Sequence, residues 1–518
     1  MRRLSILAVL CIFLLLPGQP VVAPAQNPDS PQAATSNSGK PPSKEEKPQP
    51  QVEKPPVVTH HQIHVAGRAL NYVATTGELP ILNEDGVTTG HIFFVAYTLD
   101  NPPDPAHRPL TFAFNGGPGS ASVWLHLGAI GPKRVALLPN GKMPHPPFHL
   151  ADNQDTWLDL TDLVFIDPVG TGYSRATKKE YQKNFWGVKA DIASVGEFIR
   201  LYLTRYQRWT SPLFLAGESY GTTRAAGLSG YLMDHGIALN GVILISTVLN
   251  FQTLQFTRGN DLPYVLYLPT YTATAWYYKK LTPDLEQNLD KTIAEVEPWA
   301  VTKYMEALAQ GDQLTAEERA DVIDHLARYT GLPKTYIDRC NLRINGGQFR
   351  AELLRGEGET VGRLDSRFTG YDRSGVAERP DYDPSEAAVR PPFTSTFGNY
   401  VRSKLGYKTD EVYYILGGGV KHWDWGSAGQ GFPETFDALR SAFVKNPYMK
   451  LYVAMGRFDL ATPFFAVEYT LDHLNLPSAL RSNITTGYYE AGHMIYIRNQ
   501  SLAKLKQNVG AFMQSALQ

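Results

Sequence analysis

Short apolar runs alternate with helical patterns through the middle and the end of the chain. The apolar runs lie at 110–114, 163–167, 213–216, 241–246 and 450–455, and helical periodicity appears at 184–206, 222–233, 463–474 and 501–517. Short strands that are apolar on both faces and alternate with helices are typical of a mostly parallel sheet covered by helices on both sides. The pattern therefore predicts an α/β fold.

Two further regions interrupt or precede this alternation. Residues 62–75 and 91–99 alternate or run apolar with β-branched residues, which predicts an antiparallel pair at the start of the sheet. Between about 251 and 413 the strand pattern stops, and helical segments at 283–308 and 316–329 precede a charged, glycine-bearing stretch. A segment inserted between sheet strands lies over the strand ends. We expect a largely helical cap there.

The first 58 residues differ in composition from the rest. Arg2 and Arg3 precede the apolar run 4–16, and Ala23 and Ala25 supply small residues at a cleavage site. This predicts a signal peptide at 1–25, with an uncleaved anchor as the alternative. Residues 26–58 are rich in Pro, Gln, Ser and Lys and have almost no large apolar residue, so we expect a flexible tether. The catalytic domain would then span 59–518.

Charge and cysteine content restrict the cellular compartment and the classes of partner that we expect. The formal net charge is -1, so nothing suggests a nucleic acid or an anionic membrane surface as a partner. Removal of the signal peptide takes away Cys11, and Cys340 alone cannot form an internal disulfide. A large exported chain without such a crosslink favours a bacterial periplasmic or secreted protein.

A G-x-S-x-G stretch, residues 217–221, follows one apolar run and opens a helical pattern. A strand that turns sharply into a helix around a serine exposes its hydroxyl, and the flanking glycines let strand and helix approach each other. Ser219 is therefore a candidate nucleophile. Taken alone, the motif fits an ordinary strand-to-helix turn as well.

Consecutive glycines follow an earlier strand at Asn115-Gly116-Gly117-Pro118-Gly119. Such a loop leaves its backbone amides free of side-chain crowding, so that they can point at an anion, as an oxyanion hole requires. An ordinary turn is again the alternative. No metal-ligand or nucleotide signature occurs, so we predict neither a metal site nor a cofactor.

Two late residues complete a possible triad. Asp459 follows the strand at 450–455, and His493 lies in the loop before the last helix. Serine, acid and histidine in this order are typical of α/β hydrolases. Ser219 would attack an acyl carbon, His493 would transfer the proton, and Asp459 would hold the imidazole. Singly, Asp459 fits a turn residue and His493 a surface histidine.

Four ordered motifs resemble the serine carboxypeptidase family: N-G-G-P-G at 115–119, D-x-P-x-G-x-G-x-S at 167–174, G-E-S-Y at 217–220 and G-H-M at 492–494. The resemblance runs from about His60 to the end and is weakest across the insertion. It implies an α/β hydrolase fold with a cap, a cofactor-free acyl-enzyme mechanism and release of C-terminal amino acids from peptides, usually at acidic pH.

The resemblance also assigns residues. Ser219, Asp459 and His493 correspond to the family's triad. The amides of Gly117 and Tyr220 correspond to its oxyanion hole. Asn115 and Glu218 correspond to part of the site that binds the substrate's C-terminal carboxylate.

Two positions depart from the family pattern. The family has a tryptophan where this chain has Ala113, and a glutamate where it has Ala129. In the family a pair of carboxyls, one of them protonated, binds the substrate carboxylate. Because Ala129 breaks the pair, we expect weaker selectivity for a free C-terminus and weaker dependence on acid pH, with His126, Lys133 or Arg134 as substitute anion donors.

The leading hypothesis is a secreted serine carboxypeptidase-like hydrolase that acts on peptides and, after signal removal, has no membrane contact. A close alternative keeps the triad and acts as an esterase, amidase or acyltransferase, since this fold hosts many acyl-transfer reactions. A third is a binding protein that keeps the fold without catalysis. Oligomeric state and side-chain preference stay open.

Overall fold

The computed structural model describes residues 53–426 and 431–518. The predicted signal peptide and the predicted tether up to residue 52 lie outside the described residues. Among those described, no helix combines the length and the apolarity needed to cross a membrane.

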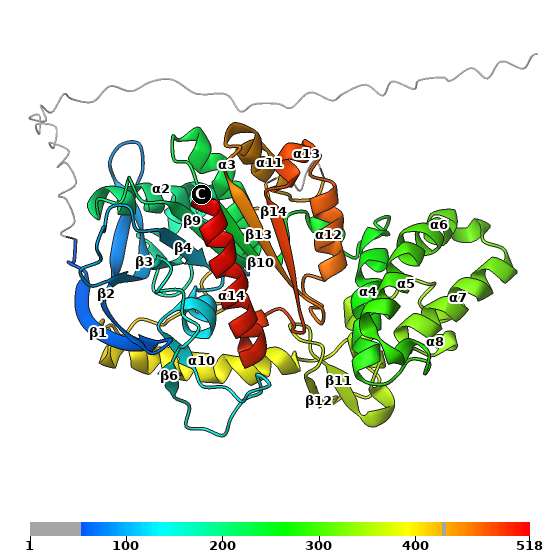
Figure 1. Ribbon diagram of the computed structural model, residues 1–518. Coiled ribbons are helices and arrows are strands. Elements are labelled where there is room, and N and C mark those ends of the chain that lie inside the picture. The colour runs from blue at the N-terminus through cyan, green and yellow to red at the C-terminus, as the bar shows by residue number, and fades with distance from the viewer. Residues whose placement is uncertain (1–52, 427–430) are drawn as a thin grey trace, which may run out of the picture. The chain divides into compact units, whose positions relative to one another are not determined.

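One large sheet organises the fold (Figure 1). Its strands, in spatial order, are β1 (Val57–Val65), β2 (Arg68–Leu82), β3 (Thr88–Leu99), β7 (Asp162–Asp167), β4 (Leu110–Phe114), β9 (Leu213–Ser219), β10 (Gly241–Thr247), β13 (Lys450–Gly456) and β14 (Ile484–Tyr489). The pairs from β1 to β7 are antiparallel, and those from β7 to β14 are parallel. The short β8 (Arg175–Ala176) pairs with β3. The predicted mostly parallel sheet is thus present.

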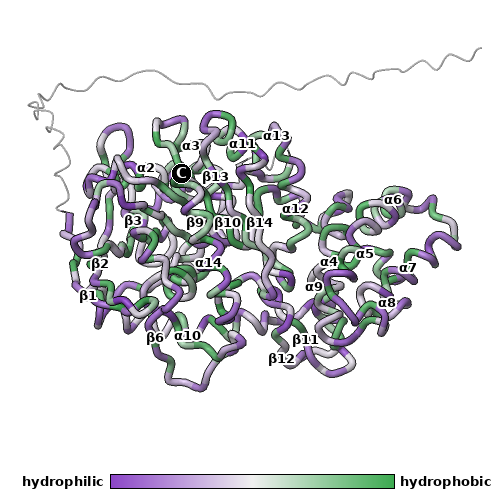
Figure 2. The backbone as a smooth tube through the Cα atoms, in the orientation of Figure 1, coloured by the Kyte–Doolittle hydropathy of each residue, from purple (hydrophilic) through white to green (hydrophobic). Residues whose placement is uncertain are grey.

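The central strands face two separate cores. In β3, Phe93 belongs to one core and Phe94 to the other, and the same alternation occurs at Leu213 and Phe214 in β9. Successive strand side chains point to opposite faces, so these strands, buried on both faces, read as continuous apolar runs. Figure 2 shows those runs in green.

Helices cover both faces. One core includes side chains from α2 (Val188–Arg205), α3 (Tyr220–Asp234), α11 (Phe436–Lys445) and α12 (Phe464–Asp472). The other includes α1 (Val123–Leu125), the π-helix η1 (His126–Ile130), α10 (Pro384–Ser403) and α14 (Asn499–Ala516). Three shorter elements are β5 (Lys133–Val135), β6 (Leu150–Asp152) and α13 (Ser478–Arg481).

The expectation of one strand at 62–75 is wrong. The chain reverses at Ala66 and Gly67, so this range belongs to β1 and β2, and β2 in turn pairs with β3. Both turn residues have positive φ, 48° and 77°. Positive φ at both central residues is the conformation of a two-residue hairpin turn that matches strand twist. The turn interrupts an apolar alternation that otherwise continues.

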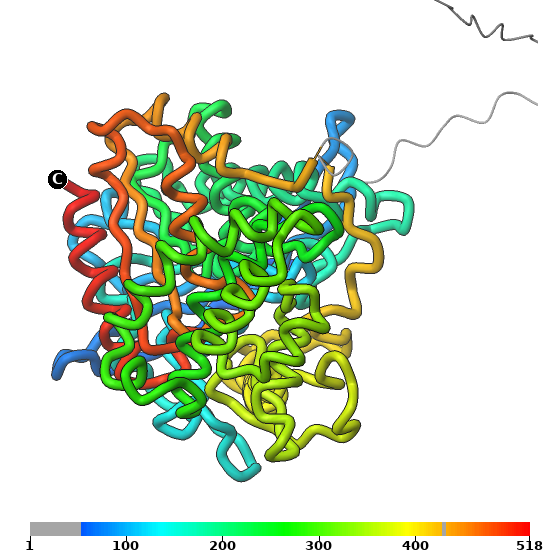
Figure 3. The backbone as a smooth tube through the Cα atoms, turned by 90° about the vertical axis from the view of Figure 1, so that its right-hand side faces the viewer, coloured from blue at the N-terminus to red at the C-terminus, as the bar shows by residue number. Residues whose placement is uncertain are grey.

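The predicted insertion contains helices of two kinds. Its first part has its own apolar core, built by α4 (Leu262–Tyr277), α5 (Leu289–Trp299), α6 (Met305–Gln310), α7 (Ala316–Thr330), α8 (Lys334–Arg339) and α9 (Gly346–Glu352), and it ends in the hairpin β11 (Glu359–Val361) and β12 (Thr369–Tyr371). Figure 3 views the chain from the side of these helices. The later helix α10 instead packs into one of the sheet's cores. We use "cap" for residues 254–371.

Candidate active site

Ser219 ends β9 and directly precedes α3, with φ 61° and ψ -132°. A non-glycine residue in this region is strained, and it persists only where the surroundings fix it. The two glycines of the motif explain how. A Cβ on Gly217 would lie 2.3 Å from the carbonyl oxygen of Gly221, and a Cβ on Gly221 would lie 2.7 Å from that of Phe114. The G-x-S-x-G pattern therefore reports close approach of strand and helix.

The glycine-rich loop after β4 lies against this turn. A Cβ on Gly116 would come 2.3 Å from the amide nitrogen of Tyr220, so no larger residue fits between the two segments. Gly117, with φ 108°, lines the same cavity as Ser219. The structure thus places the loop that carries Gly117 beside the first turn of α3. The assignment of the Gly117 and Tyr220 amides as an oxyanion hole stays a prediction.

Asp459 and His493 come together at the ends of neighbouring strands β13 and β14. His493 Nδ1 lies 2.8 Å from Asp459 Oδ2, and Asp459 is fully buried. The Asp459 carboxylate also accepts from the amides of Ala461 and Thr462 and from the Thr462 hydroxyl. These bonds fix the carboxylate, which in turn orients the imidazole.

The charge of His493 follows from this environment. Burial lowers the pKa of His493, but the carboxylates of Asp459 and Glu218 raise that pKa by more, so it lies above the ordinary value for histidine. An imidazole whose protonated form is stabilised accepts a proton readily, as a general base must.

A cavity of about 150 Å³ holds Ser219 and His493 in its lining, together with Asn115, Glu218 and Gly117. All predicted site residues except Asp459, which lies behind His493, and Tyr220 line it. Within the described residues no hydrogen bond joins the Ser219 hydroxyl to His493. Such bonds often tighten only when a substrate is bound.

Glu218 is buried beside Tyr496 and Asn115. Burial raises the pKa of Glu218 to about 7, against the opposing effects of His493, Tyr496 and Asn115. Neither Glu218 Oε2 nor the Tyr496 hydroxyl has a hydrogen-bond partner in the part of the chain that the structure describes. A buried polar atom without a partner is costly. Glu218 is therefore a neutral acid at mildly acidic pH, and it is one of the residues that line the cavity.

The suggested substitute anion donors are wrong. None of them lines the cavity. His126 hydrogen-bonds Tyr97 at 2.7 Å and stacks on Phe165, and burial lowers the pKa of His126 to about 3, so it is neutral. Lys133 is ion-paired with Asp152. Arg134, on β5, is also absent from the lining, and Ala129 is fully buried in a core.

The motif at 167–174 supports the glycine-rich loop. Asp167 accepts from both the amide and the hydroxyl of Ser122, at 2.8 and 2.7 Å. A Cβ on Gly172 would lie 1.8 Å from Asp167 Oδ2, which only glycine avoids. Burial raises the pKa of Asp167 to about 6. This motif therefore holds the segment after the glycine loop and does not enter the cavity.

A segment of the cap, Arg363–Arg367, is bound to both loops that carry the triad partners. Leu460 donates its amide to the Arg363 carbonyl and Ser366 donates to the Phe458 carbonyl, so the segment brackets Asp459. On its other side the His493 amide donates to the Leu364 carbonyl. We call residues 363–367 the clamp segment. It fixes the two loops relative to each other.

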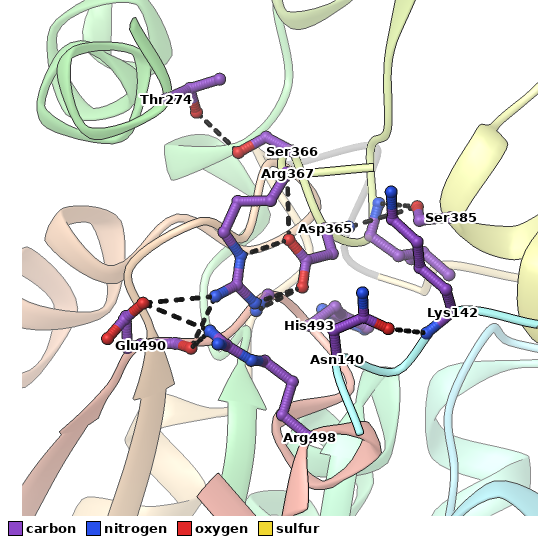
Figure 4. A network of polar contacts seen from close by, with 12 residues as sticks. Asn140, Lys142, Thr274, Asp365, Ser366, Arg367, Ser385, Glu490, His493 and Arg498 are labelled. Atoms are coloured by element: carbon purple, nitrogen blue, oxygen red, sulfur yellow. Dashed lines mark hydrogen bonds and ion pairs between the residues drawn. The ribbon is translucent and has the colours of Figure 1, made fainter. Parts of the chain in front are cut away.

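A buried ion pair sits inside the clamp segment (Figure 4). Arg367 binds Asp365 through Nε and Nη2, at 2.9 and 2.6 Å, and both side chains are almost fully buried. Arg367 also donates to the Glu490 carbonyl, and Asp365 accepts from the Gly492 amide. The pair thus connects the cap to the loop that carries His493.

Sequence reasoning missed several residues that line the cavity. They are Trp124, Arg363, Leu364, Glu386, Val389 and Leu416. Trp124 brings a tryptophan into the cavity lining, although the chain has Ala113 at the position of the family's tryptophan. Its indole donates to Ser120 at 2.9 Å. Arg363, Glu386 and Val389 come from the predicted insertion, where no motif indicated their role.

Comparison with known proteins places this geometry in a family. The sequence profile described as serine carboxypeptidase matches residues 79–361, which is more than half of the chain. The matched part contains Ser219, whereas Asp459 and His493 lie beyond it. Their juxtaposition with Ser219 rests on the structure.

Curated relatives match shorter segments. The chain is 31% identical over 144 residues to the retinoid-inducible serine carboxypeptidase of Mus musculus, and 31% identical over 166 residues to the pheromone-processing carboxypeptidase of Schizosaccharomyces pombe. These segments cover 27% and 32% of this chain, and 28% and 30% of the relatives. The chain therefore matches less than a third of either relative. Both are eukaryotic, so a bacterial origin finds no support in them.

A solved structure matches over most of the chain. The prohormone-processing carboxypeptidase from Saccharomyces cerevisiae superimposes with a TM-score of 0.51 at 16% identity, covering 85% of this chain and 91% of that one. This likeness confirms the predicted α/β hydrolase fold. The profile match over more than half of the chain leads to one conclusion: the chain belongs to the serine carboxypeptidase family.

Proposed function

We propose that this protein is a serine carboxypeptidase that removes C-terminal residues from peptides through an acyl-enzyme on Ser219. One observation carries the proposal: Ser219, His493 and the buried carboxyl of Glu218 line one cavity. Ser219 would attack the last peptide carbonyl, with the Gly117 and Tyr220 amides holding the oxyanion. Asp459 would hold His493 in the required tautomer, and His493 would pass the proton to the leaving amino acid.

Glu218 would recognise the C-terminus. In its neutral form it donates a hydrogen bond to the substrate's carboxylate, and the Asn115 amide donates another. Because the pKa of Glu218 is about 7, the neutral form persists up to near-neutral pH without a second carboxyl at position 129. This supports weaker dependence on acid pH than a carboxyl pair would give.

The alternative is an esterase, amidase or acyltransferase with the same triad. Ala129 favours it, because one neutral carboxyl binds a free C-terminus less selectively than a pair does. The peptide substrate and the export of the chain are likewise proposals. Export rests on residues 1–25 and is tested by the N-terminal sequence of the mature protein.

Mass spectrometry of products separates the two activities. Matched peptides with a free or an amidated C-terminus are incubated with the wild type and with Ser219→Ala. The proposal expects stepwise loss of single C-terminal residues from the free acids, and no products with the variant. Equal processing of amidated peptides, or cleavage of esters alone, would support the alternative.

A further inference from the structure

A second cavity adjoins the catalytic cavity through Arg363, which lines both. It has a volume of about 470 Å³. Leu460 and Ala461, which directly follow Asp459, form part of its wall, and the rest comes mainly from the cap. We call it the arginine cavity. Arg363, in the clamp segment, is therefore a wall residue of both cavities.

Two arginines without side-chain partners line this cavity. Across residues 53–426 and 431–518, the side chains of Arg350 and Arg363 make no hydrogen bond and no ion pair. Arg350 Nε is buried, whereas Arg363 is exposed. Burial lowers the pKa of Arg350; Asp383 opposes this, and the nearby charge of Arg363 adds to it. Two guanidiniums that face one space without a partner are arranged for an anion.

Several other cap arginines are paired with carboxylates. Arg343 binds Asp261 at 2.7 Å, Arg355 binds Glu352 at 2.6 Å and Arg319 binds Asp338 at 2.8 Å. No carboxylate lines the arginine cavity among the described residues. Asp383, the acid that acts on Arg350, already accepts hydrogen bonds from the Arg363 and Leu364 amides and from Ser385.

The remaining walls define the shape of the ligand. Phe251, Phe256 and Tyr267 contribute aromatic surface. A ligand that fits both the aromatic walls and the two arginines has a short apolar stem and a carboxylate end. A guanidinium pairs with a carboxylate through two parallel hydrogen bonds. Glutamate and aspartate side chains have this form.

We propose that the arginine cavity is a subsite for an acidic side chain of the peptide substrate, on the acyl side of the scissile bond. The proposal rests on the function proposed above, because the C-terminal carboxylate is assigned there to Asn115 and Glu218. The arginine cavity lies instead beside the Asp459 loop and the cap. It would thus select the residue that remains on the shortened peptide.

The test compares kcat/KM for peptide pairs that differ only by Glu or Gln before the scissile bond. We expect the wild type to prefer Glu by about tenfold, and Arg350→Gln and Arg363→Gln to reduce this ratio toward one. Arg339→Gln, an exposed arginine of the same cap outside both cavities, should retain the ratio. An unchanged ratio in Arg350→Gln would overturn the proposal. The proposal would also be overturned if Arg350→Gln and Arg363→Gln lowered only the preference for free-acid over amidated peptides. That result would assign the substrate's C-terminal carboxylate to the arginines.

Binding to Ser219→Ala by calorimetry gives a readout that needs no turnover. We expect the Glu peptide to bind about tenfold more tightly than the Gln peptide, and Arg350→Gln to remove that difference in the same background. Retained binding preference without any hydrolysis by the wild type would contradict the proposed function alone. Hydrolysis with no preference in either assay would contradict the subsite alone.

Discussion

The ends of the sheet strands and the cap both contribute charged residues to the candidate site, but they hold them differently. Asp459, after β13, accepts four hydrogen bonds and has no exposed surface. Arg350 and Arg363, in the cap, have no side-chain partner in the described residues. Groups with every partner in place are rigid, as chemistry requires, whereas groups without partners are available to a ligand. The sheet would therefore perform the reaction and the cap would select the substrate.

Removal of the nucleophile is the strongest test of the sheet side. Ser219→Ala should lower kcat for peptide hydrolysis by at least about 10⁴-fold, because no other group forms the acyl-enzyme. Initial rates measured by product formation check this. Ser482→Ala, at an exposed serine, should retain the wild-type rate. A variant at Ser219 with nearly full activity would contradict the assignment.

The orienting acid comes next. Asp459→Asn keeps the size of the side chain but favours the wrong tautomer of His493, and we expect kcat to fall by roughly 10³- to 10⁴-fold. Peptide binding to the variant should change little, which calorimetry can measure. Asp312→Asn, exposed in the cap, provides the matched control. A loss below tenfold would mean that Asp459 has only a structural role.

Substitution of the buried ion pair in the clamp segment tests how much this connection between cap and sheet contributes to the free energy of unfolding. Asp365→Asn leaves Arg367 charged and buried, and should lower the free energy of unfolding by about 3 kcal/mol, as urea denaturation would show. Arg373→Gln breaks an exposed pair with Asp381 and should cost less than about 1 kcal/mol. Equal effects of the two substitutions would show that the buried pair contributes nothing special.

The smallest effect concerns pH. The pKa of Glu218 is about 7, above its ordinary value, so the proton is retained as pH rises and is lost around neutrality. For free-acid peptides, kcat/KM should therefore fall about tenfold per unit above pH 7. Glu218→Gln, a permanent hydrogen-bond donor, should remove that fall. Amidated peptides, measured in parallel, should not show it.

The same shift affects stability. Because folding raises the pKa of Glu218, its neutral form stabilises the folded state fully below its ordinary pKa, and this contribution is lost as pH rises through about 7. Glu218→Gln should flatten the dependence of unfolding free energy on pH in that range. An identical slope in wild type and variant would place the titration elsewhere.

Local patterns predicted the sheet side well. The strand 110–114 is found within the same bounds, and the glycines of the elbow mark close contacts that only glycine permits. Asp459 and His493 could be paired from the sequence because serine, acid and histidine follow in the order typical of α/β hydrolases. The structure brings the two together because β13 and β14 are neighbouring parallel strands. The hairpin turn at Ala66 and Gly67 was missed, since one turn barely disturbs a long apolar alternation.

The cap side could not be predicted in the same way. Helix α4 is buried almost all round, so it lacks the one-sided period that identifies a helix, and α10 contains Pro391 and Pro392. Arg363 reaches the cavity only through tertiary packing of the clamp segment against two distant loops. No spacing in the sequence signals that contact. The sequence showed Ala129 in place of the family's glutamate. It did not show which other residues line the cavity.

The most direct test of the account is covalent labelling with a fluorophosphonate under native conditions, followed by peptide mapping. The account predicts one adduct, on Ser219, that is absent in Ser219→Ala and forms far more slowly in Asp459→Asn. A folded protein that forms no adduct, or forms it on another residue, would contradict the claim that the strand ends assemble an acyl-transfer site.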